Sequence, residues 1–385
     1  MTTLAQLPIK NKRVFLRLDL NVPLNKGKIT DDLRIVNALP TIKYILSKDP
    51  KQLILASHLG RPNGRDKRLS MAPIAKALVK ALGRPLYVAE DILAPLPEEP
   101  LVLLENLRFY SEEKQGDVKF AKQLARHADV YVDDAFGTAH RKDASVYALA
   151  KQFEKKSYGL LIKNELQYVH LKHKKPLVAI FGAAKIADKV KLLEQLLKHV
   201  DKVLLGGAVV FTFLKAMGGE VGTSLVEDEM IPDAKRIMKK YGDKLVFPVD
   251  IVVAAKTSLG KTMTAAERKK ISTVVSIDVL PKNKAGFDIG PQSIKLFQRV
   301  LADAKTVVWN GPLGVAEIKP YDTSTNKLAK FLAEENKTVI VCGGDTAAAL
   351  RKTKYAQAMT HISTGGGASL QLLGGKKLPG IEVLK

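Results

Sequence analysis

Cysteine, tryptophan and long apolar runs are scarce in this sequence. Its one cysteine, Cys342, excludes an internal disulfide and a metal cluster held by several thiolates, which fits a reducing compartment. The longest uncharged apolar stretch, residues 203–214, falls short of the ~20 residues that a membrane-spanning helix needs. Residues 1–10 contain no apolar run of signal-peptide length. We therefore expect a cytoplasmic protein without a membrane segment.

Two familiar nucleotide-binding fingerprints are also missing or incomplete. The motif G-x-G-x-x-G does not occur, so a nicotinamide-dependent dehydrogenase has no direct support. Residues 255–262 approach a P-loop and end in Gly260, Lys261 and Thr262, but Ala255 stands where the first glycine is required. We interpret this segment as a surface loop and keep a P-loop ATPase or ligase as an alternative function.

Positive charge is abundant but diffuse. The 385 residues include 62 Lys and Arg against 39 Asp and Glu, a net charge of +23, and 46% of them are hydrophobic. This length suggests two domains or one large one, and this composition suggests packed cores. The basic clusters, such as 268–270, lack the interleaved aromatics of a single-strand binding surface. Nucleic-acid binding as the main function is therefore disfavoured.

Short apolar runs alternate with amphipathic stretches of helical length. Strands are predicted at 14–19, 52–57, 101–104, 129–133, 177–181, 202–205, 306–309 and 338–342, and helices at 72–82, 117–127, 186–199 and 323–335. Continuous apolar runs are typical of strands buried on both faces. The alternation predicts an α/β fold, with parallel sheets covered by helices.

The predicted strands end differently in the two halves of the chain. In the first half they end in polar or charged residues, and in the second half they end in glycine, as at Gly182, Gly206, Gly311 and Gly343. Ligands of open α/β sheets bind beyond the carboxyl ends of the strands. We therefore expect two domains with two different ligand sites.

The boundary between the domains is predicted near Gly159. No Gly/Ser-rich linker separates the halves, and residues 160–173 have a helical pattern, which favours a stiff connection. The predicted fold is two Rossmann-like domains, each a mostly parallel sheet covered by helices on both faces, joined by a helical hinge. We assign 1–158 to the first domain, 159–175 to a linker helix and 176–370 to the second domain.

Arginines recur at or just after strand ends in the first half, with His58 close by. They are Arg17, Arg34, Arg61, Arg108 and Arg141. Each guanidinium grips phosphate or carboxylate through paired hydrogen bonds, so their convergence would suit a phosphorylated acid. The alternative is that they are surface arginines with no shared role.

The glycine-ended strands of the second half suit a nucleotide. Glycine between a strand and a helix lets backbone N–H groups approach phosphate. Asp345 and Thr346 directly follow Gly343 and Gly344, which places a carboxylate where a nucleotide-bound Mg²⁺ needs one. The alternative is that these glycines form tight packing turns.

Longer motifs carry a family resemblance. The first half contains RLDLNVP (17–23), DDLRIVNALPTI (31–42), SHLGRP (57–62), LLENLRF (103–109) and VDDAFGTAHR (132–141). The second half adds AKIADK (184–189), FTFLK (211–215), DIGP (288–291), WNGPLGVAE (309–317), GGDTA (343–347) and STGGGASL (363–370). In this order, and along nearly the whole chain, these segments resemble the phosphoglycerate kinases.

The resemblance implies reversible phosphoryl transfer between 1,3-bisphosphoglycerate and ADP, giving 3-phosphoglycerate and ATP, in glycolysis and gluconeogenesis. It implies phosphoglycerate binding in the first domain, ADP or ATP with Mg²⁺ in the second, and closure about the hinge. It further implies a monomer in which residues 371–385 return to the first domain. From the short apolar runs and the diffuse charge, no membrane partner is expected and a nucleic-acid partner is disfavoured. Both acceptors are already anionic, so the chemistry requires charge stabilisation and alignment rather than a general base.

The matching motifs also imply individual residue roles. The substrate-binding positions are Asp19, Leu20, Asn21, Arg34, His58, Leu59, Gly60, Arg61, Arg108 and Arg141. The nucleotide-binding positions are Lys185, Lys189, Gly311, Glu317, Gly343, Gly344, Asp345 and Thr346, with Asp345 holding the metal. Arg34 and Lys185 would stabilise the transferred phosphoryl group from opposite sides, aided by Gly365 and Gly366 at a helix start.

Several positions depart from the family pattern, and the tryptophan that is usual before the DIGP segment (288–291) is missing. Ala183 and Ala208 replace glycines, Ala316 stands where phenylalanine is usual, and Cys342 replaces a glycine before Gly343. Added methyl groups of this kind crowd loops expected near the nucleotide, whereas the phosphoglycerate motifs are intact. A basic polyanion-binding or scaffolding protein that keeps the fold is the non-enzymatic alternative.

Overall fold

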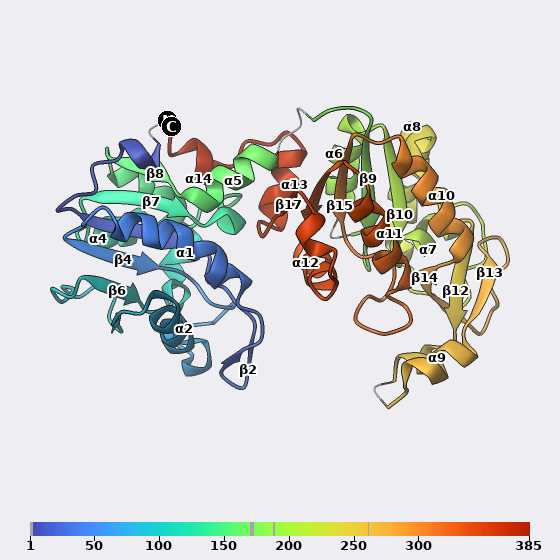
Figure 1. The fold of residues 1–385 in the computed structure, drawn as a ribbon, viewed down its shortest axis with the longest axis horizontal. Coiled ribbons are helices and arrows are strands. Elements are labelled where there is room, and N and C mark those ends of the chain that lie inside the picture. Colours follow the sequence, from blue (N-terminus) through green and yellow to red (C-terminus); the bar gives the residue numbers. More distant parts are fainter. Residues whose placement is uncertain (1–2, 170–172, 188, 261) are drawn as a thin grey trace. The chain divides into compact units, whose positions relative to one another are not determined.

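The chain divides into two compact units. The computed structural model describes residues 3–169, 173–187, 189–260 and 262–385. Unit 1 comprises Met1–Gln167 and Lys376–Lys385, and unit 2 comprises Tyr168–Gly375. Residues 170–172 of the expected linker helix, and Lys261 of the P-loop-like segment, lie outside the described residues. Figure 1 follows the chain from blue to red through both units.

Unit 1 is built on a six-stranded parallel sheet with the order β5-β6-β4-β1-β7-β8. The strands are β1 (Arg13–Leu18), β4 (Gln52–Ala56), β5 (Tyr87–Ala89), β6 (Leu101–Leu104), β7 (Val130–Asp134) and β8 (Lys156–Tyr158). Leu16 pairs in register with Leu55 on one side and with Val132 on the other. β4, β6 and β7 are buried along their whole length, and β1 is buried after Arg13, as expected of a sheet covered on both faces.

Helices cover both faces of this sheet. One apolar core includes residues of α1 (Leu33–Leu46) and α2 (Ala72–Leu82), and the opposite core includes residues of α4 (Val118–Ala125). Leu16 faces the first core and Phe15 the second, because successive strand residues point to opposite faces. A short α3 (Ser111–Gln115) and a hairpin of β2 (Leu24–Asn25) and β3 (Lys28–Ile29) complete the unit before its connecting helix.

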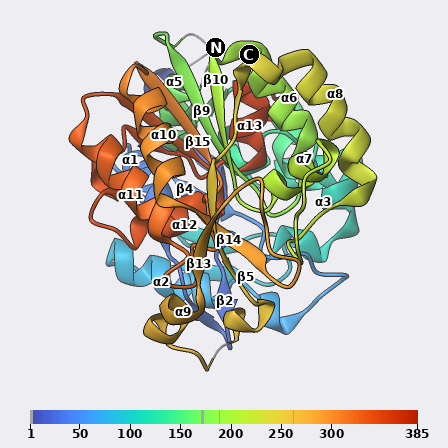
Figure 2. The same ribbon diagram turned by 90° about the vertical axis from the view of Figure 1, so that its right-hand side faces the viewer.

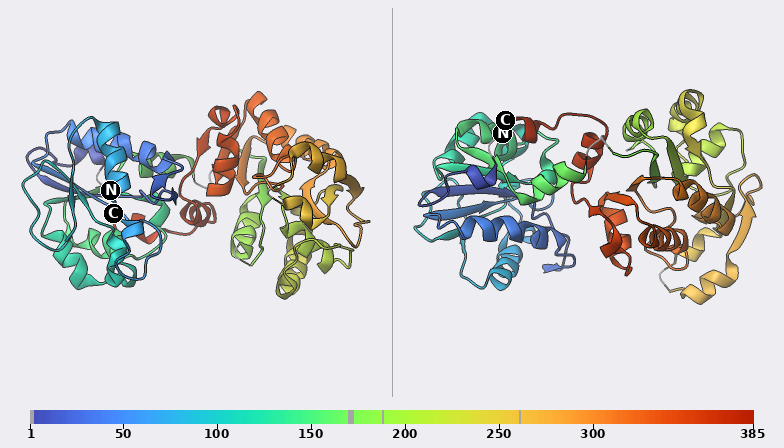
Figure 3. Two further views of the ribbon diagram at one scale, coloured as in Figure 1. Left: turned by 90° about the horizontal axis from the view of Figure 1, so that it is seen from below. Right: turned by 45° about the horizontal axis from the view of Figure 1, so that its top comes forward.

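A buried carboxylate anchors that connecting helix, α5 (Leu160–Tyr168). Asp134 accepts hydrogen bonds from the Thr41 hydroxyl of α1 and from Ile162 N at 2.9 Å. Burial raises the pKa of Asp134 to about 6. The chain returns to unit 1 with α14 (Pro379–Glu382), where Gly380 N donates to Ala139 O at 2.9 Å. Figure 3 shows this C-terminal end back within unit 1, while residues 371–375 belong to unit 2.

Unit 2 contains a second six-stranded parallel sheet, ordered β11-β10-β9-β15-β16-β17. Its strands are β9 (Leu177–Gly182), β10 (Lys202–Gly206), β11 (Leu245–Val246), β15 (Thr306–Asn310), β16 (Thr338–Cys342) and β17 (His361–Ile362). Its helices are α6 (Val190–His199), α7 (Val209–Ala216), α8 (Ile231–Tyr241), α9 (Ala265–Ile271), α10 (Pro291–Ala302), α11 (Thr323–Glu334), α12 (Gly344–Arg351) and α13 (Gly367–Leu373). Figure 2 shows α10 and α11 on one side of β9, β10 and β15, with α6, α7 and α8 on the other.

An antiparallel sheet, ordered β13-β12-β14, extends unit 2 beyond what the sequence predicted. It consists of β12 (Asp250–Ala254), β13 (Thr273–Ser276) and β14 (Ala285–Ile289). The P-loop-like segment follows β12 as a short 3₁₀ turn, Lys256–Leu259, and among the described residues after this turn the next α-helix, α9, begins only at Ala265. A P-loop joins a strand directly to a helix start, so the arrangement argues against that alternative.

The eight predicted strands are all present, and the predicted helices differ only at their ends. The helix predicted at 186–199 begins at Val190, because Lys189 N donates to Ile186 O at 2.8 Å, a spacing of three residues that is typical of a turn. Among the described residues, no helix is long and apolar enough to cross a membrane. The α/β fold with two sheet-based units therefore agrees with the sequence prediction.

Candidate functional site

A polar cavity of about 220 Å³ lies in unit 1, beyond the carboxyl ends of β1, β4 and β7. Its lining residues are Asp19, Asn21, Arg34, His58, Gly60, Arg61, Arg108, Gly137, Thr138 and Arg141. Eight of these were predicted as substrate-binding positions, and the structure brings them together because β1 lies between β4 and β7 in the sheet. Four arginines face a single carboxylate, so the cavity favours a multiply charged anion.

Arg17 does not line this cavity, contrary to the expectation that it joins the other arginines. Its side chain is fully buried; Nε donates to Ser145 Oγ at 2.7 Å, and Nη2 lies 3.8 Å from Glu113 Oε1. Nη2 also lies 3.2 Å from His58 Nδ1. Arg17 therefore acts on the cavity indirectly, through its contact with His58, which lines it.

The contact with Arg17 fixes the protonation of His58. A guanidinium is only a donor, so His58 Nδ1 accepts and the ring proton resides on Nε2. Burial, followed by the charges of Arg17 and Arg108, lowers the pKa of His58 well below its usual value. His58 therefore offers the cavity a neutral N–H donor rather than a further positive charge.

Arg34 is placed by the first turn of α1. It forms an ion pair with Asp19, whose side chain is only 6% exposed, while Arg34 itself remains 31% exposed. The neighbouring Asn21 accepts a hydrogen bond from Gly60 N at 2.8 Å, which ties the loop after β1 to the loop after β4. Arg34 is thus held by its ion pair with Asp19 and remains accessible to a ligand in the cavity.

Asn106 is a supporting residue that sequence reasoning did not single out. Its buried side-chain oxygen accepts from Leu59 N and Arg108 N, both at 3.1 Å, and its amide donates to Leu59 O at 2.8 Å. Arg108 in turn donates to Gly60 O at 2.8 Å, and its Nε has no partner. Asn106 therefore orders the loop that carries Arg108, and Arg108 retains a buried donor for a ligand.

The remaining predicted positions in unit 1 fall into two groups. Arg141 Nε donates to His140 Nε2 at 3.2 Å, and burial, with Arg141, lowers the pKa of His140. Leu20 and Leu59 do not line the cavity, because their side chains are buried in the apolar core. Their backbone amides already donate to Ser57 Oγ and Asn106 Oδ1.

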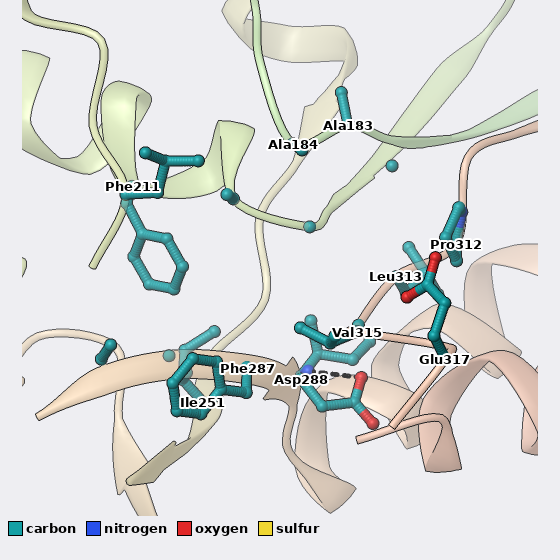
Figure 4. Close-up of a pocket in the computed structure, with 18 of the residues that line it drawn as sticks. Ala183, Ala184, Phe211, Ile251, Phe287, Asp288, Pro312, Leu313, Val315 and Glu317 are labelled. Carbon is teal, nitrogen blue, oxygen red and sulfur yellow. Dashed lines mark hydrogen bonds between the residues drawn. The ribbon is translucent and has the colours of Figure 1, made fainter. Parts of the chain in front are cut away.

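A larger cavity of about 410 Å³ lies in unit 2. Its apolar end is lined by Phe211, Leu225, Ile251, Leu259, Phe287 and Val315. Lys189, Glu317 and Asp345 also line it and supply charged groups. Figure 4 shows Phe211 and Ile251 on one side, with Glu317 and Pro312 on the other. An apolar cavity with a few charged groups suits a flat base joined to a phosphate chain.

Several predicted nucleotide positions shape this cavity without lining it. Gly311 has φ +89°, and a Cβ there would lie 1.5 Å from Gly182 O, so only glycine fits. Thr346 Oγ1 accepts from Gly311 N at 2.6 Å and donates to Cys342 O at 3.2 Å. These contacts join the ends of β9, β15 and β16. Gly343, Gly344, Gly365 and Gly366 lie at the starts of α12 and α13 and are also outside the cavity lining.

The two predicted lysines occupy different positions. Lys189 lines the cavity and donates to Asn310 Oδ1 at 3.2 Å, whereas Lys185 is exposed and outside the lining. Between them, Ile186 N and Ala187 N donate to the buried carboxylate of Glu227. Glu227 was missed by sequence reasoning, because it lies some forty residues away along the chain. These two amides already donate to a carboxylate, so they are not available to a ligand.

A buried carboxyl group also borders the unit 2 cavity. Asp288 accepts from Ser324 N at 3.0 Å and from Ile289 N at 2.9 Å, and it also accepts from the Ser324 hydroxyl. Burial raises the pKa of Asp288 to about 7. Within the described ranges, no three His, Cys, Asp or Glu residues cluster as a ready-made metal site. Asp288 instead joins β14 to the start of α11.

The family departures are unevenly placed. Ala183 and Ala208 line the unit 2 cavity, whereas Ala316 and Cys342 do not. Cys342 is fully buried, and its carbonyl accepts from Asn310 Nδ2 at 2.9 Å. Only the first two methyl groups therefore reduce the space open to a ligand.

Unit 1 has a parallel sheet with an arginine-lined cavity for an anion. Unit 2 has a parallel sheet with an apolar cavity bordered by lysine and aspartate. Together they define a two-domain α/β phosphotransferase. Comparisons with known proteins specify it further. Residues 4–376 match the family model described as phosphoglycerate kinase. The chain belongs to the phosphoglycerate kinase family. The predicted membership and kinase activity are confirmed: the chain catalyses that family's glycolytic phosphoryl transfer between 1,3-bisphosphoglycerate and ADP.

Relatives and solved structures match over the full length. The phosphoglycerate kinase of Nostoc punctiforme is 44% identical over 100% of this chain and 98% of its own. A cytosolic phosphoglycerate kinase of Triticum aestivum is 45% identical over 99% and 97%. The structure of phosphoglycerate kinase from Coxiella burnetii aligns with a TM-score of 0.87 at 38% identity, covering 100% of this chain and 98% of that one. That from Pyrococcus horikoshii gives 0.86 at 28%, with the same coverage.

Proposed function

We propose that the unit 1 cavity binds 3-phosphoglycerate and 1,3-bisphosphoglycerate. The observation that carries this proposal is the convergence of Arg34, Arg61, Arg108 and Arg141 on one cavity of about 220 Å³. Arginine forks match both phosphate and carboxylate, the two anionic groups of 3-phosphoglycerate. Asp19, Asn21 and the neutral Nε2–H of His58 suit its hydroxyl group. Leu20, Leu59 and Gly60 act through the backbone that holds these side chains.

The unit 2 cavity is proposed to bind ADP and ATP. Its apolar end, with Phe211 and Phe287, suits the base. Glu317 and Lys189 line the same cavity. Glu317 would accept hydrogen bonds from the ribose hydroxyls, and Lys189 would bind phosphate. Gly311, Gly343, Gly344 and Thr346 hold the strand ends that border the cavity.

A magnesium ion would be held by Asp345 together with the nucleotide phosphates. Asp345 lies in the first turn of α12 and lines the cavity, and one carboxylate plus substrate phosphates is the ligand set that Mg²⁺ usually takes. When bound, the ion supplies charge neutralisation between phosphate oxygens. The residues present therefore fit the group, without a protein-only metal cluster in the described chain.

The proposed transfer step uses charge stabilisation and no general base. The carboxylate of 3-phosphoglycerate and the terminal phosphate of ADP are already anionic, so neither must lose a proton to attack. Arg34 on the substrate side and the exposed Lys185 on the nucleotide side are proposed to stabilise the transferred phosphoryl group. Gly365 and Gly366 at the start of α13 would add backbone donors.

Donor and acceptor bind to different units, so we further propose that transfer occurs after closure about the connecting segment. Closure would exclude water, which otherwise competes for the acyl phosphate. One chain carries both cavities, which supports a monomeric enzyme. The cytosolic names of two relatives support a cytoplasmic location.

Activity and binding together test this proposal. ADP formation from ATP and 3-phosphoglycerate should require Mg²⁺, and EDTA should abolish it. In calorimetry, R108A should lose 3-phosphoglycerate binding but keep ADP binding, whereas D345N should weaken Mg²⁺-ADP binding and keep 3-phosphoglycerate binding. If either variant lost both ligands equally while remaining folded, the assignment of one ligand to each unit would be wrong.

A further inference from the structure

Arg268 on α9 is a buried cation whose partners are all main-chain oxygens. Its residue is 8% exposed. Nε donates to Ser258 O and Nη2 to Gly260 O, both at 2.8 Å, and Nη1 donates to Lys319 O at 3.3 Å. The rigid guanidinium fork suits several fixed acceptors at once. Arg268 therefore joins segments about sixty residues apart in the sequence.

Both of these segments form walls of the unit 2 cavity. The segment after β12 contributes Lys256 and Leu259 to the lining, and the segment after β15 contributes Val315 and Glu317. Arg268 itself is outside the lining. Arg268 thus connects the two walls on the side facing away from the cavity, where it does not contact a ligand.

A chain of hydroxyl groups joins the same two segments a second time. Tyr321 OH lies 3.0 Å from Ser258 Oγ and 3.1 Å from Ser272 Oγ, and Ser272 Oγ donates to Arg268 O at 2.7 Å. The fully buried Tyr321 ring packs on Phe287, with centroids 5.0 Å apart, and Phe287 lines the cavity. The wall positions are therefore fixed by an interconnected set of buried polar contacts.

We propose that Arg268 is a positioning residue that sets the width of the base-binding end of the cavity, and with it nucleotide affinity and base selectivity. This inference rests on the proposed nucleotide site. The walls carrying Leu259 and Val315 are loop segments, so their separation depends on the contacts that join them. Without the guanidinium, Ser258 O and Lys319 O lose this donor and Gly260 O keeps Met263 N at 3.3 Å, so the two walls remain joined through Tyr321 and Ser258 but less tightly. A wider cavity would hold adenine less tightly and discriminate less between purines.

The same geometry accounts for the P-loop-like sequence at 255–262. In a P-loop, backbone N–H groups point at phosphate. Here the carbonyls of Ser258 and Gly260 point at Arg268. The segment therefore serves a nucleotide cavity as a wall held by a cation, rather than as a phosphate cradle.

The test compares R268M, which keeps most of the stem but removes the donors, with R268K, which keeps the charge but not the fork. K270M is the matched control, because Lys270 is an exposed cation on the same helix. Calorimetry would measure the Kd of ADP and GDP, and assays would measure KM for ATP and for 3-phosphoglycerate. R268M should raise the Kd of ADP about tenfold, as expected for losing buried hydrogen bonds, and reduce the preference for ADP over GDP. R268K should fall in between, and K270M should match wild type.

Changes confined to the nucleotide would support the inference, so KM for 3-phosphoglycerate should stay within about twofold of wild type. An unchanged ADP Kd in R268M, or an equal loss of ADP and GDP affinity, would overturn it. If R268M did not fold, R268K would decide by the same criteria. If wild type bound ADP and both variants bound it identically, only the role of Arg268 would fail. A wild type unable to bind ADP would overturn the nucleotide site and this role together.

Discussion

Arg17 Nη2 lies 3.2 Å from His58 Nδ1 beneath the arginine-lined cavity of unit 1. The Arg17 guanidinium does not line the cavity; it instead orients the neutral imidazole of His58, which does. One arginine of the first half therefore serves the anion site indirectly, through a histidine that donates from Nε2.

The first prediction concerns the titration of His58. Because burial and the neighbouring arginines lower its pKa well below the usual value, His58 should remain neutral across pH 6 to 8. Its imidazole NMR signal, assigned with an H58Q variant, should not shift over this range. A titration midpoint at or above 6.5 would contradict the proposed tautomer.

The second prediction concerns Arg34. R34A should lower kcat by about 10²–10³-fold, the usual effect of removing one donor that stabilises transition-state charge, while the Kd of ADP stays unchanged. The coupled 3-phosphoglycerate assay and calorimetry would measure both. R68A is the matched control, because Arg68 lies in the same unit and its side chain is 89% exposed. Near-wild-type turnover in R34A would remove Arg34 from the mechanism.

The third prediction concerns Glu227. E227A leaves Ile186 N and Ala187 N without their carboxylate, so the turn between Lys185 and Lys189 should loosen. We expect KM for ATP to rise, KM for 3-phosphoglycerate to remain constant, and the free energy of unfolding to fall by about 2–4 kcal/mol. Kinetics and urea denaturation would measure these changes.

Two further variants make the test of Glu227 specific. E227Q should recover part of the loss, because its amide oxygen still accepts. D228N, at a neighbour with a 68% exposed side chain, should resemble wild type. Equal effects of E227A on both Michaelis constants would argue against a local role in the nucleotide site.

The fourth prediction concerns Asp133, which is fully buried. Burial raises its pKa from 3.8 to about 7, and its Oδ2 has no hydrogen-bond partner. An acid whose pKa is higher in the folded state than in the unfolded state makes its full contribution to the free energy of unfolding at pH values below the unfolded-state pKa. This contribution is lost as the pH rises through the folded-state pKa. D133N cannot ionise, yet its side-chain oxygen can still accept from Ala135 N.

The free energy of unfolding of D133N minus that of wild type should therefore rise by on the order of 4 kcal/mol between pH 4 and about pH 7. Above pH 7 this difference should stay constant. Urea denaturation across this range would measure it. For the control D303N, at an exposed carboxyl group, the free energy of unfolding should change with pH as it does in wild type. A pH-independent difference for D133N would show that Asp133 does not titrate within the folded range.

The parallel sheets could be predicted because their strands are continuous apolar runs, whereas the antiparallel sheet could not. In β13 the residues 273–276 are partly or fully exposed, and β14 contains Gly286 and Asp288 within five residues. The predicted start of α6 was wrong by four residues, because a turn bonded by Glu227 precedes Val190.

The arginine cavity could be predicted because parallel strands end at one edge of a sheet. The exception is Arg17, which lies within β1 rather than beyond its end and is buried there. Asn106, Glu227 and Arg268 could not be recognised, since each has an essential backbone partner some forty to fifty residues away: Leu59, Ile186 and Lys319, respectively. Their partners become neighbours only through the fold.

Cys342 and Trp309 are the only cysteine and the only tryptophan of the chain, and both are fully buried in unit 2. Their strands, β16 and β15, are hydrogen-bonded neighbours. Selectively excited tryptophan fluorescence and thiol labelling of the native chain therefore report on the opening of unit 2 alone. Unit 1 contributes to neither signal, so the unfolding of unit 2 can be followed separately without mutating the chain.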